Sequence, residues 1–579
     1  MTFLTAHHQS TPKDTDSLRI FDALSPFFLH HPEGQMNWSK IPFAHLERDG
    51  KLDPDVIGDI LIEFDRHIRA MARLGYNAIV LDDLAHLANL AQYPRDLQAK
   101  LADYHDLYRE LFALIARYDL RVFVATDANF TVNDPTTAGT TSESLLQEAI
   151  RTAFDTWPML DGVTIRIGEA DGVDHEGDFR SQVAVKTPTE ARQLIQQVLP
   201  EFESRGKLLI FRTWTLGAYP VGDLIWNHHT YDDVFGGIDS DNLIVSLKYG
   251  DADFFRYLDL NPLFFHGRQK KIIEFQARRE YEGMGEYPSF VGFLYEKYIR
   301  ELRAGQANVV GMFALQGGGW APFQRTAFST QASMWNELNA QATVQLFMGT
   351  PIDTIIRDFA HDREIANVEE FTRFLRLADS AIESGLYVRE MAEQPMYFRR
   401  VRIPPLTWVF WTTVSTGGIV SALARSAVRD TDAAISEGYD AVTTVDEMHA
   451  IADRLHLGNH GLAFQRETFD LLAQSRELLL GVATPETRRE TRDRAEAFAQ
   501  TYPQTYRFEA PDAPGWIERR AIPKAVPMLV RNRPGYRWQD RLMLTPTASR
   551  VQRGVARTQP GMMPGYVDRV GMPLDVLLR

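Results

Sequence analysis

Eight short apolar runs, each followed by a polar loop, constrain the fold of this chain most strongly. Helical patterns lie between most of the runs; over residues 56–74, for example, apolar side chains recur with the spacing of one helix face. Short apolar runs that alternate with helices are typical of parallel strands buried on both faces. The runs cover 18–29, 77–81, 121–125, 162–167, 207–212, 242–247, 271–276 and 308–313. Eight such units ending near residue 315 predict an α/β fold, the (β/α)8 or TIM barrel.

The character of the sequence changes after Phe313. A glycine-rich loop comes first, and mainly helical patterns then run from about residue 329 to residue 501. From residue 502 the chain is rich in Pro and Arg and has few periodic segments. We therefore expect a barrel over 1–328, a helical domain over 329–501 and an extended C-terminal segment over 502–579. This segment is expected to wrap the body or to form a homodimer contact.

Composition excludes several classes of partner. A net charge of −15, from 62 basic and 77 acidic residues, argues against nucleic acid. Cysteine is absent, which excludes disulfides and thiolate chemistry, and the N-terminus lacks the apolar core of a signal peptide. Both observations favour a cytoplasmic location. The uncharged stretch 403–424 contains Thr, Ser, Gly and Pro, so we expect it to be buried or to line a groove, and we expect no membrane contact.

Carboxylates follow three of the predicted strands. Glu169 comes after the fourth, Asp251 and Asp253 after the sixth, and Glu280 and Glu282 after the seventh. Groups at these positions converge on the C-terminal mouth of a barrel. An inverting glycosidase needs one carboxylic acid to protonate the leaving oxygen and another carboxylate to activate water. Glu169 suits the first role, and Asp253 or Glu280 the second; ordinary acidic surface loops are the alternative.

Basic residues accompany these acids. Arg166, Arg212 and Lys248 end strands four, five and six. Such cations can hold the carboxylate of an acidic sugar, and Arg does so with two hydrogen bonds. A buried ion network inside the barrel is the other interpretation, and we favour it for Glu274 on strand seven. For Arg212 and Lys248 the spacing leaves both interpretations open.

Aromatic and histidine residues add weaker signals. Trp214 and Trp320 could stack on sugar rings, although Trp is more often buried in an interface. His30 and Trp38 are expected to line the sugar pocket. A metal-dependent barrel hydrolase would need a His-x-His pattern on an early strand, which is missing, and no phosphate loop or dinucleotide fingerprint occurs. Neither a metal nor a cofactor is expected.

Taken together, these residues resemble the α-glucuronidases of glycoside hydrolase family 67. The likeness spans about residues 75–340 and is most specific in Lys248-Tyr249-Gly250-Asp251-Ala252-Asp253-Phe254 and Glu280-Tyr281-Glu282-Gly283. The family's N-terminal domain has no counterpart before the first predicted strand. The resemblance implies that Glu169 is the general acid and that Asp253 and Glu280 serve the attacking water. It also implies that Arg166, Arg212 and Lys248 grip the glucuronate carboxylate.

The sequence thus predicts an inverting, exo-acting glycoside hydrolase similar to α-glucuronidases, which releases a uronic acid from an oligosaccharide. A barrel glycosidase for a neutral glycoside and a non-catalytic carbohydrate-binding relative are the alternatives. The basic residues favour an acidic over a neutral substrate, and the carboxylates favour an enzyme over a binding protein.

Overall fold

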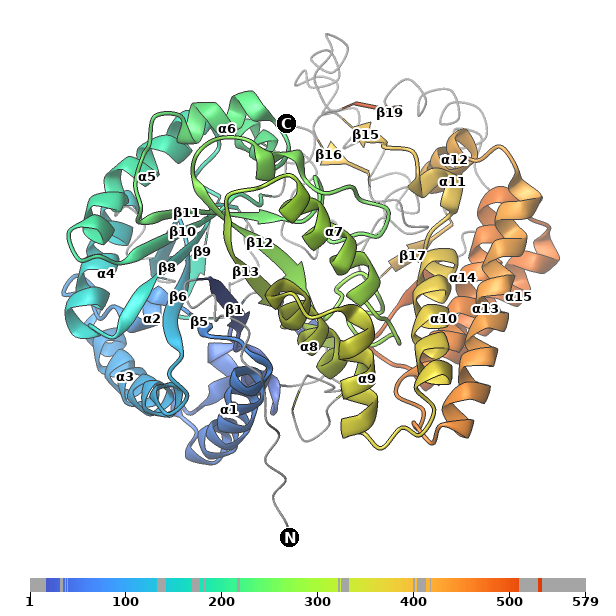
Figure 1. Cartoon of the computed structure of the whole chain (residues 1–579), viewed down its shortest axis with the longest axis horizontal. Coiled ribbons are helices and arrows are strands. Elements are labelled where there is room, and N and C mark those ends of the chain that lie inside the picture. Colours follow the sequence, from blue (N-terminus) through green and yellow to red (C-terminus); the bar gives the residue numbers. More distant parts are fainter. Residues whose placement is uncertain are drawn as a thin grey trace.

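The eight predicted strands form one closed parallel barrel (Figure 1). The computed structural model describes residues 17–31, 35–36, 38, 40–132, 142–168, 177–181, 183–215, 219–320, 323, 328, 333–398, 401–403, 413–416, 418–509 and 530–533. The barrel strands are β1 (Leu18–Asp22), β5 (Ala78–Asp82), β6 (Arg121–Asp127), β8 (Leu160–Arg166), β10 (Leu208–Arg212), β11 (Leu243–Lys248), β12 (Lys270–Gln276) and β13 (Val309–Leu315). They neighbour one another in chain order, and β13 closes the ring on β1. The predicted fold class is confirmed.

Helices surround this barrel. They are α1 (Pro54–Leu74), α2 (Leu84–Leu87), α3 (Arg95–Ala116), α4 (Ser142–Thr156), α5 (Pro188–Glu203), α6 (His228–Phe235), α7 (Gly292–Ala304) and α8 (Met334–Met348). Short 3-10 helices lie in the loops: η1 (Ser25–Phe28), η2 (Phe43–Leu46), η4 (Pro220–Ile225) and η5 (Pro262–Phe265). Helix α8 contacts α1, α7 and β13, so it takes the place of the last barrel helix, although the sequence division put it in the helical domain.

Strand alternation gives the barrel interior two layers. Side chains two residues apart on a strand point the same way. The lower layer is apolar and contains Ile20, Val80, Phe123, Ala125, Ile210, Ile244 and Ile272. Two residues beyond members of this layer stand Asp22, Asp82, Asp127, Arg212, Ser246 and Glu274, all buried. A polar layer therefore lies on an apolar floor, at the carboxyl ends of the strands.

The second part of the molecule is helical. Its helices are α9 (Ile352–Asp362), α10 (Val368–Leu386), α11 (Arg389–Ala392), α12 (Gly418–Ala427), α13 (Thr431–Arg454), α14 (Leu462–Leu480) and α15 (Pro485–Thr501). Helix α13 packs against both α10 and α14, beside the barrel (Figure 1). Aromatic contacts join the two parts, since Tyr287 of the β12–α7 loop meets Phe464 and Phe469.

Strands of two or three residues complete the structure. They pair as β2 (Gln35–Met36) with β14 (Gly319–Trp320), β3 (Glu47–Arg48) with β4 (Lys51–Leu52), β7 (Phe130–Val132) with β9 (Phe179–Ser181), β15 (Tyr397–Phe398) with β16 (Val401–Arg402) and β19 (Val530–Arg531), and β17 (Thr413–Ser415) with β18 (Arg507–Glu509). Strands β18 and β19 show that the described residues after 502 pack on their own chain. A homodimer contact stays a prediction. In the described part of the chain, no helix has the length and apolarity needed to cross a membrane.

Candidate active site

Charged side chains crowd the barrel mouth. Seven of the eight strands place a buried charged residue there: Asp22, Asp82, Asp127, Arg166, Arg212, Lys248 and Glu274. A buried charge is tolerated only when it is paired and hydrogen-bonded. The ion pairs among these residues therefore determine which side chains can bind a ligand at the mouth.

The predicted catalytic Asp253 is held by three donors. Lys248 Nζ lies 2.6 Å from its Oδ1, the Phe254 backbone N–H donates to the same oxygen over 3.0 Å, and the Tyr281 hydroxyl donates to Oδ2. The Lys248 ammonium also lies 3.6 Å from the ring centroid of Trp214. Three predicted site residues, Lys248, Trp214 and Asp253, thus meet in one cluster after β11.

Arg212 forms a two-pronged ion pair with Glu274. Its Nε and Nη2 each lie 2.8 Å from a carboxylate oxygen, and the Ser246 hydroxyl donates to Glu274 over 2.7 Å. Burial alone would raise the pKa of Glu274, but Arg212, with help from Lys248 and Ser246, outweighs it and lowers that pKa. The buried ion network expected for Glu274 is confirmed.

Arg166 bridges two carboxylates that the sequence interpretation missed. Its Nη2 lies 3.0 Å from Asp82 and its Nε 3.0 Å from Asp127. Burial raises the pKa of Asp82 to about 7 in spite of Arg166. For Asp127, burial is outweighed by Arg166 and Lys40, which push its pKa well below the ordinary range. Neighbouring carboxylates with separated pKa values are the usual basis of an acid and base assignment.

The remaining predicted residues lie in different surroundings. Glu280 is buried in the β12–α7 loop, beside Tyr281 in the chain. Trp320 is fully buried, with its ring 5.6 Å from that of Tyr506. Trp38 is half-buried and packs against Gly318. His30 turns toward Asp59 on α1, 3.0 Å away, with 42% of its side chain exposed, and the structure gives it no described contact in the mouth cluster. Glu169 lies outside the described residues.

A visible signal could have located the missed acids. The predicted second and third strands stopped at Leu81 and Ala125, whereas β5 and β6 run on to Asp82 and Asp127. Alternation from the apolar positions would have directed both acids inward. Asp22 ends β1 in the same way, and burial raises its pKa to about 6.

The helical part holds the loop that carries Asp253. Asp251 accepts hydrogen bonds from Tyr397, over 2.7 Å, and from Arg402, over 2.9 Å. On the other side of Asp253, Arg256 pairs with Glu282 of the β12–α7 loop and with Asp379 of α10. Both ends of the loop are therefore fixed by residues from outside it.

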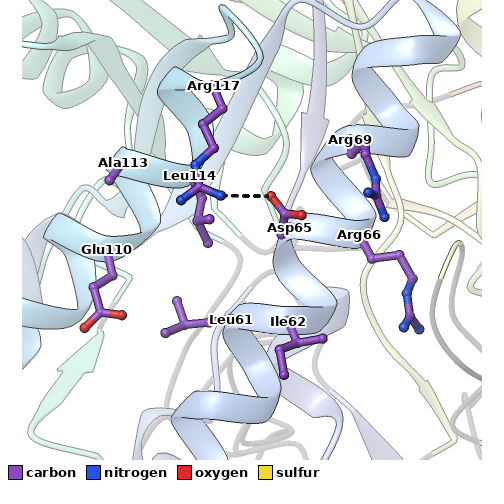
Figure 2. Close-up of a pocket in the computed structure, with 9 residues that line it drawn as sticks. All are labelled: Leu61, Ile62, Asp65, Arg66, Arg69, Glu110, Ala113, Leu114 and Arg117. Carbon is purple, nitrogen blue, oxygen red and sulfur yellow. Dashed lines mark ion pairs between the residues drawn. The ribbon is translucent and has the colours of Figure 1, made fainter.

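The described residues also form a hollow away from the barrel mouth. A hollow of about 480 Å³ lies between α1 and α3 on the outside of the barrel (Figure 2). Asp65 and Arg117 face each other across it at 4.0 Å, and its described lining includes none of the predicted site residues. No group of three His, Cys, Asp or Glu side chains in the described part of the chain is arranged to hold a metal ion.

Comparison with known proteins adds little beyond the fold. No known family profile and no curated protein matches the sequence, so membership of the family that it resembles is not shown. Similar solved structures include a GH138 enzyme targeting pectin rhamnogalacturonan II, with 10% identity and a TM-score of 0.49 over 88% of this chain and 67% of that one. CpGH84B has 12% identity and a TM-score of 0.34, and the match covers 72% of this chain and 65% of CpGH84B. A D-allulose 3-epimerase from Methylomonas sp. has 12% sequence identity and a TM-score of 0.32. The match covers 57% of this chain and 98% of the epimerase. Likenesses this weak carry no argument about activity.

Proposed function

We propose that this protein is a glycoside hydrolase whose active site lies at the C-terminal mouth of the barrel. The observation that supports the proposal is the ring of buried carboxylates and cations at that mouth, with Asp253 fixed at its edge. A glycosidase needs two carboxyl groups on opposite sides of a sugar ring. A ring of acids on successive strands provides them, and an aromatic side chain, Trp214, stands beside the cluster.

The catalytic roles follow from position. Asp253 accepts hydrogen bonds from three donors, and this arrangement orients a carboxylate to receive a proton from water. Glu280 would assist it from the β12–α7 loop. Glu169, three residues beyond Arg166 at the end of β8, would protonate the leaving oxygen. Water then attacks the anomeric carbon directly, and the configuration at that carbon inverts.

We propose a uronic acid as the sugar released. Lys248 is a buried cation with three N–H donors, and in the described part of the chain Asp253 engages one of them. A sugar carboxylate at this point would gain a charge-assisted hydrogen bond. Arg212 and Arg166 stand on the two preceding strands and would complete the cationic side of the site. The product would be a uronic acid released from the end of an oligosaccharide, as from an α-glucuronide.

The test compares an aryl α-glucuronide with the matching aryl α-glucoside. The wild type should prefer the glucuronide, and proton NMR should show the inverted anomer first. In the double variant Arg212→Met/Glu274→Leu, which removes both charges of the buried pair, the ratio of the two kcat/KM values should fall by about 10-fold or more, the value of one charge-assisted contact of about 1.5–3 kcal/mol.

Taking the ratio within one preparation cancels any loss of folded protein. A wild type that prefers the glucoside, or an unchanged ratio in the variant, would overturn the acidic substrate. Retention of configuration would overturn only the inverting mechanism.

A further inference from the structure

The hollow between α1 and α3 lies on the outside of the barrel, away from the proposed active site (Figure 2). Its lining residues recur at intervals of three and four positions, so each helix contributes one continuous face. On α1 they are Leu61, Ile62, Asp65, Arg66 and Arg69; on α3 and its C-cap they are Glu110, Ala113, Leu114 and Arg117. The hollow is therefore a groove between two neighbouring helix faces.

One end of this groove is apolar. Leu61 and Leu114 are half-buried there, and Ile62 keeps 62% of its surface exposed. One turn before Ile62 on the same face of α1 stands Gly58, where an added Cβ would meet nothing within 4 Å. Glycine inside a helix lowers the stability of that helix, and no described neighbour requires it here. Because this position has no side chain, the backbone of a partner can approach α1 closely.

The other end of the groove is cationic. Arg69 follows Ile62 by seven residues, about 10 Å along α1, and Arg117 lies at the matching end of α3 (Figure 2). Arg69 makes no hydrogen bond or ion pair with the residues that the structure describes. Among those residues the Arg117 guanidinium pairs only with Asp65, at 4.0 Å, which is too far for a hydrogen bond. Asp65 itself accepts a hydrogen bond from the Tyr118 hydroxyl over 2.9 Å. Both guanidinium groups can therefore donate to an acidic partner.

Shape and charge indicate what kind of partner fits. Ile62 and the Arg117 side chain are 62% and 64% exposed, so the groove is shallow. A site for a small molecule buries about 70–90% of the ligand, which a shallow groove does not. A helix that lies along the groove can cover it, with apolar side chains at i, i+3, i+4 and i+7 as anchors. Three arginines against two acids, Asp65 and Glu110, favour a partner with acidic groups.

The net charge of −15 on the whole chain is compatible with an acidic partner at this place. At physiological salt, exposed charges more than about 8 Å apart are largely screened from each other. The acids of a docked helix would therefore respond mainly to the arginines beside them.

We propose that the groove between α1 and α3 binds an amphipathic helix of a partner protein. The apolar face of that helix would cover Leu61, Ile62 and Leu114, and acidic residues at one of its ends would pair with Arg69 and Arg117. The groove is separate from the barrel mouth, so this inference does not depend on the proposed function.

The test measures peptide binding to the full chain by fluorescence anisotropy. One helical peptide of about 18 residues carries leucines at the anchor spacing and glutamates at one end, and a second peptide has lysines in place of the glutamates. The groove variants are Arg69→Glu, Arg117→Glu and Ile62→Asp. Arg109→Glu is the matched control for Arg117→Glu, since Arg109 is 62% exposed on α3 and lies outside the lining.

We expect the acidic peptide to bind the wild type about tenfold or more tightly than the basic peptide, and added salt to weaken its binding. Each groove variant should weaken binding by about fivefold or more, because it replaces an attractive or apolar contact with repulsion, and Arg109→Glu should leave binding unchanged. Hydrogen–deuterium exchange should slow in α1 and α3 when the acidic peptide binds. The inference would be overturned by no binding up to about 1 mM peptide, by equal binding of both peptides, or by equal effects of Arg117→Glu and Arg109→Glu.

Light scattering without peptide tests a second copy of this chain as the occupant. We expect Ile62→Asp to leave the oligomeric state unchanged. A wild-type dimer that Ile62→Asp converts to a monomer would assign the groove to self-association and overturn the acidic partner. Hydrolytic activity enters neither measurement, so a failure of the proposed function would not change either result.

Discussion

Removing the carboxylate of Glu274 should destabilise the centre of the barrel severely. The Arg212–Glu274 pair is almost fully buried, with side-chain exposures of 5% and 0%. In Glu274→Leu, the Arg212 guanidinium would lose its two 2.8 Å contacts and the Ser246 hydroxyl its acceptor. Removing one partner of a buried ion pair costs about 3–5 kcal/mol, because the remaining charge loses contacts that offset its removal from water.

A double variant separates the cost of removing one partner from the net contribution of the ion pair to stability. Arg212→Met/Glu274→Leu removes both charges of the pair, and such replacements are often neutral or stabilising. We expect it to regain most of the lost stability. Glu301→Leu is the matched control, since the Lys297–Glu301 pair on α7 is exposed and long, at 3.9 Å, and should matter by less than about 1 kcal/mol.

Hydrogen–deuterium exchange of peptides from β10, β11 and β12 is the assay. It reports local opening and does not require that a chain of 579 residues unfold in one step. A change of about 3–5 kcal/mol corresponds to exchange roughly two to three and a half orders of magnitude faster. An acceleration below tenfold in Glu274→Leu, or a double variant as unstable as the single one, would refute the reasoning.

Three further outcomes are expected. Glu169→Gln should depress hydrolysis by orders of magnitude for poor leaving groups and far less for nitrophenol, which needs little protonation; equal losses would contradict its role as the acid. Folded Asp82, with a pKa of about 7, keeps a proton that the unfolded chain releases near its ordinary value of 3.8. Wild-type stability should therefore decline between about pH 4 and pH 7, and Asp82→Asn should make the decline of Tm with pH smaller. If Tm falls equally with pH in the wild type and in Asp82→Asn, the protonation of folded Asp82 is contradicted. Gly162→Ala would put a Cβ 2.1 Å from the Leu208 carbonyl oxygen and should lower Tm markedly, whereas Gly58→Ala, with nothing within 4 Å, should stabilise α1 by about 1 kcal/mol; the opposite ranking would contradict both.

The strands could be predicted because each is a continuous apolar run, and burial on both faces leaves that pattern in the sequence. The acids Asp82 and Asp127 were missed because the runs were ended at their last apolar residue, although one more step of alternation reaches each acid. The paired strands β15 and β19 have two residues each, too few for any period to show.

The partners within the site were out of reach for a different reason. Arg166 and Asp82 are 84 residues apart in the chain, and Tyr397 and Asp251 are 146 apart. Spacing along a sequence does not determine which of several acids and bases at one mouth will pair. Arg166, Arg212 and Lys248 do end β8, β10 and β11, as the sequence predicted. Their roles stay predictions.

The contacts between the helical part and the loop around Asp253 limit where this chain can be divided by recombination or protein engineering. Asp251 and Arg256 depend on Tyr397, Arg402 and Asp379, which lie more than a hundred residues further along the chain. The barrel therefore does not hold this loop in place by itself. If recombination replaced the helical part alone, the replacement would have to supply a hydroxyl, a guanidinium and a carboxylate at the positions of Tyr397, Arg402 and Asp379. Gene fusions that keep residues 17–402 together should preserve the loop, and breakpoints between 320 and 379 should not.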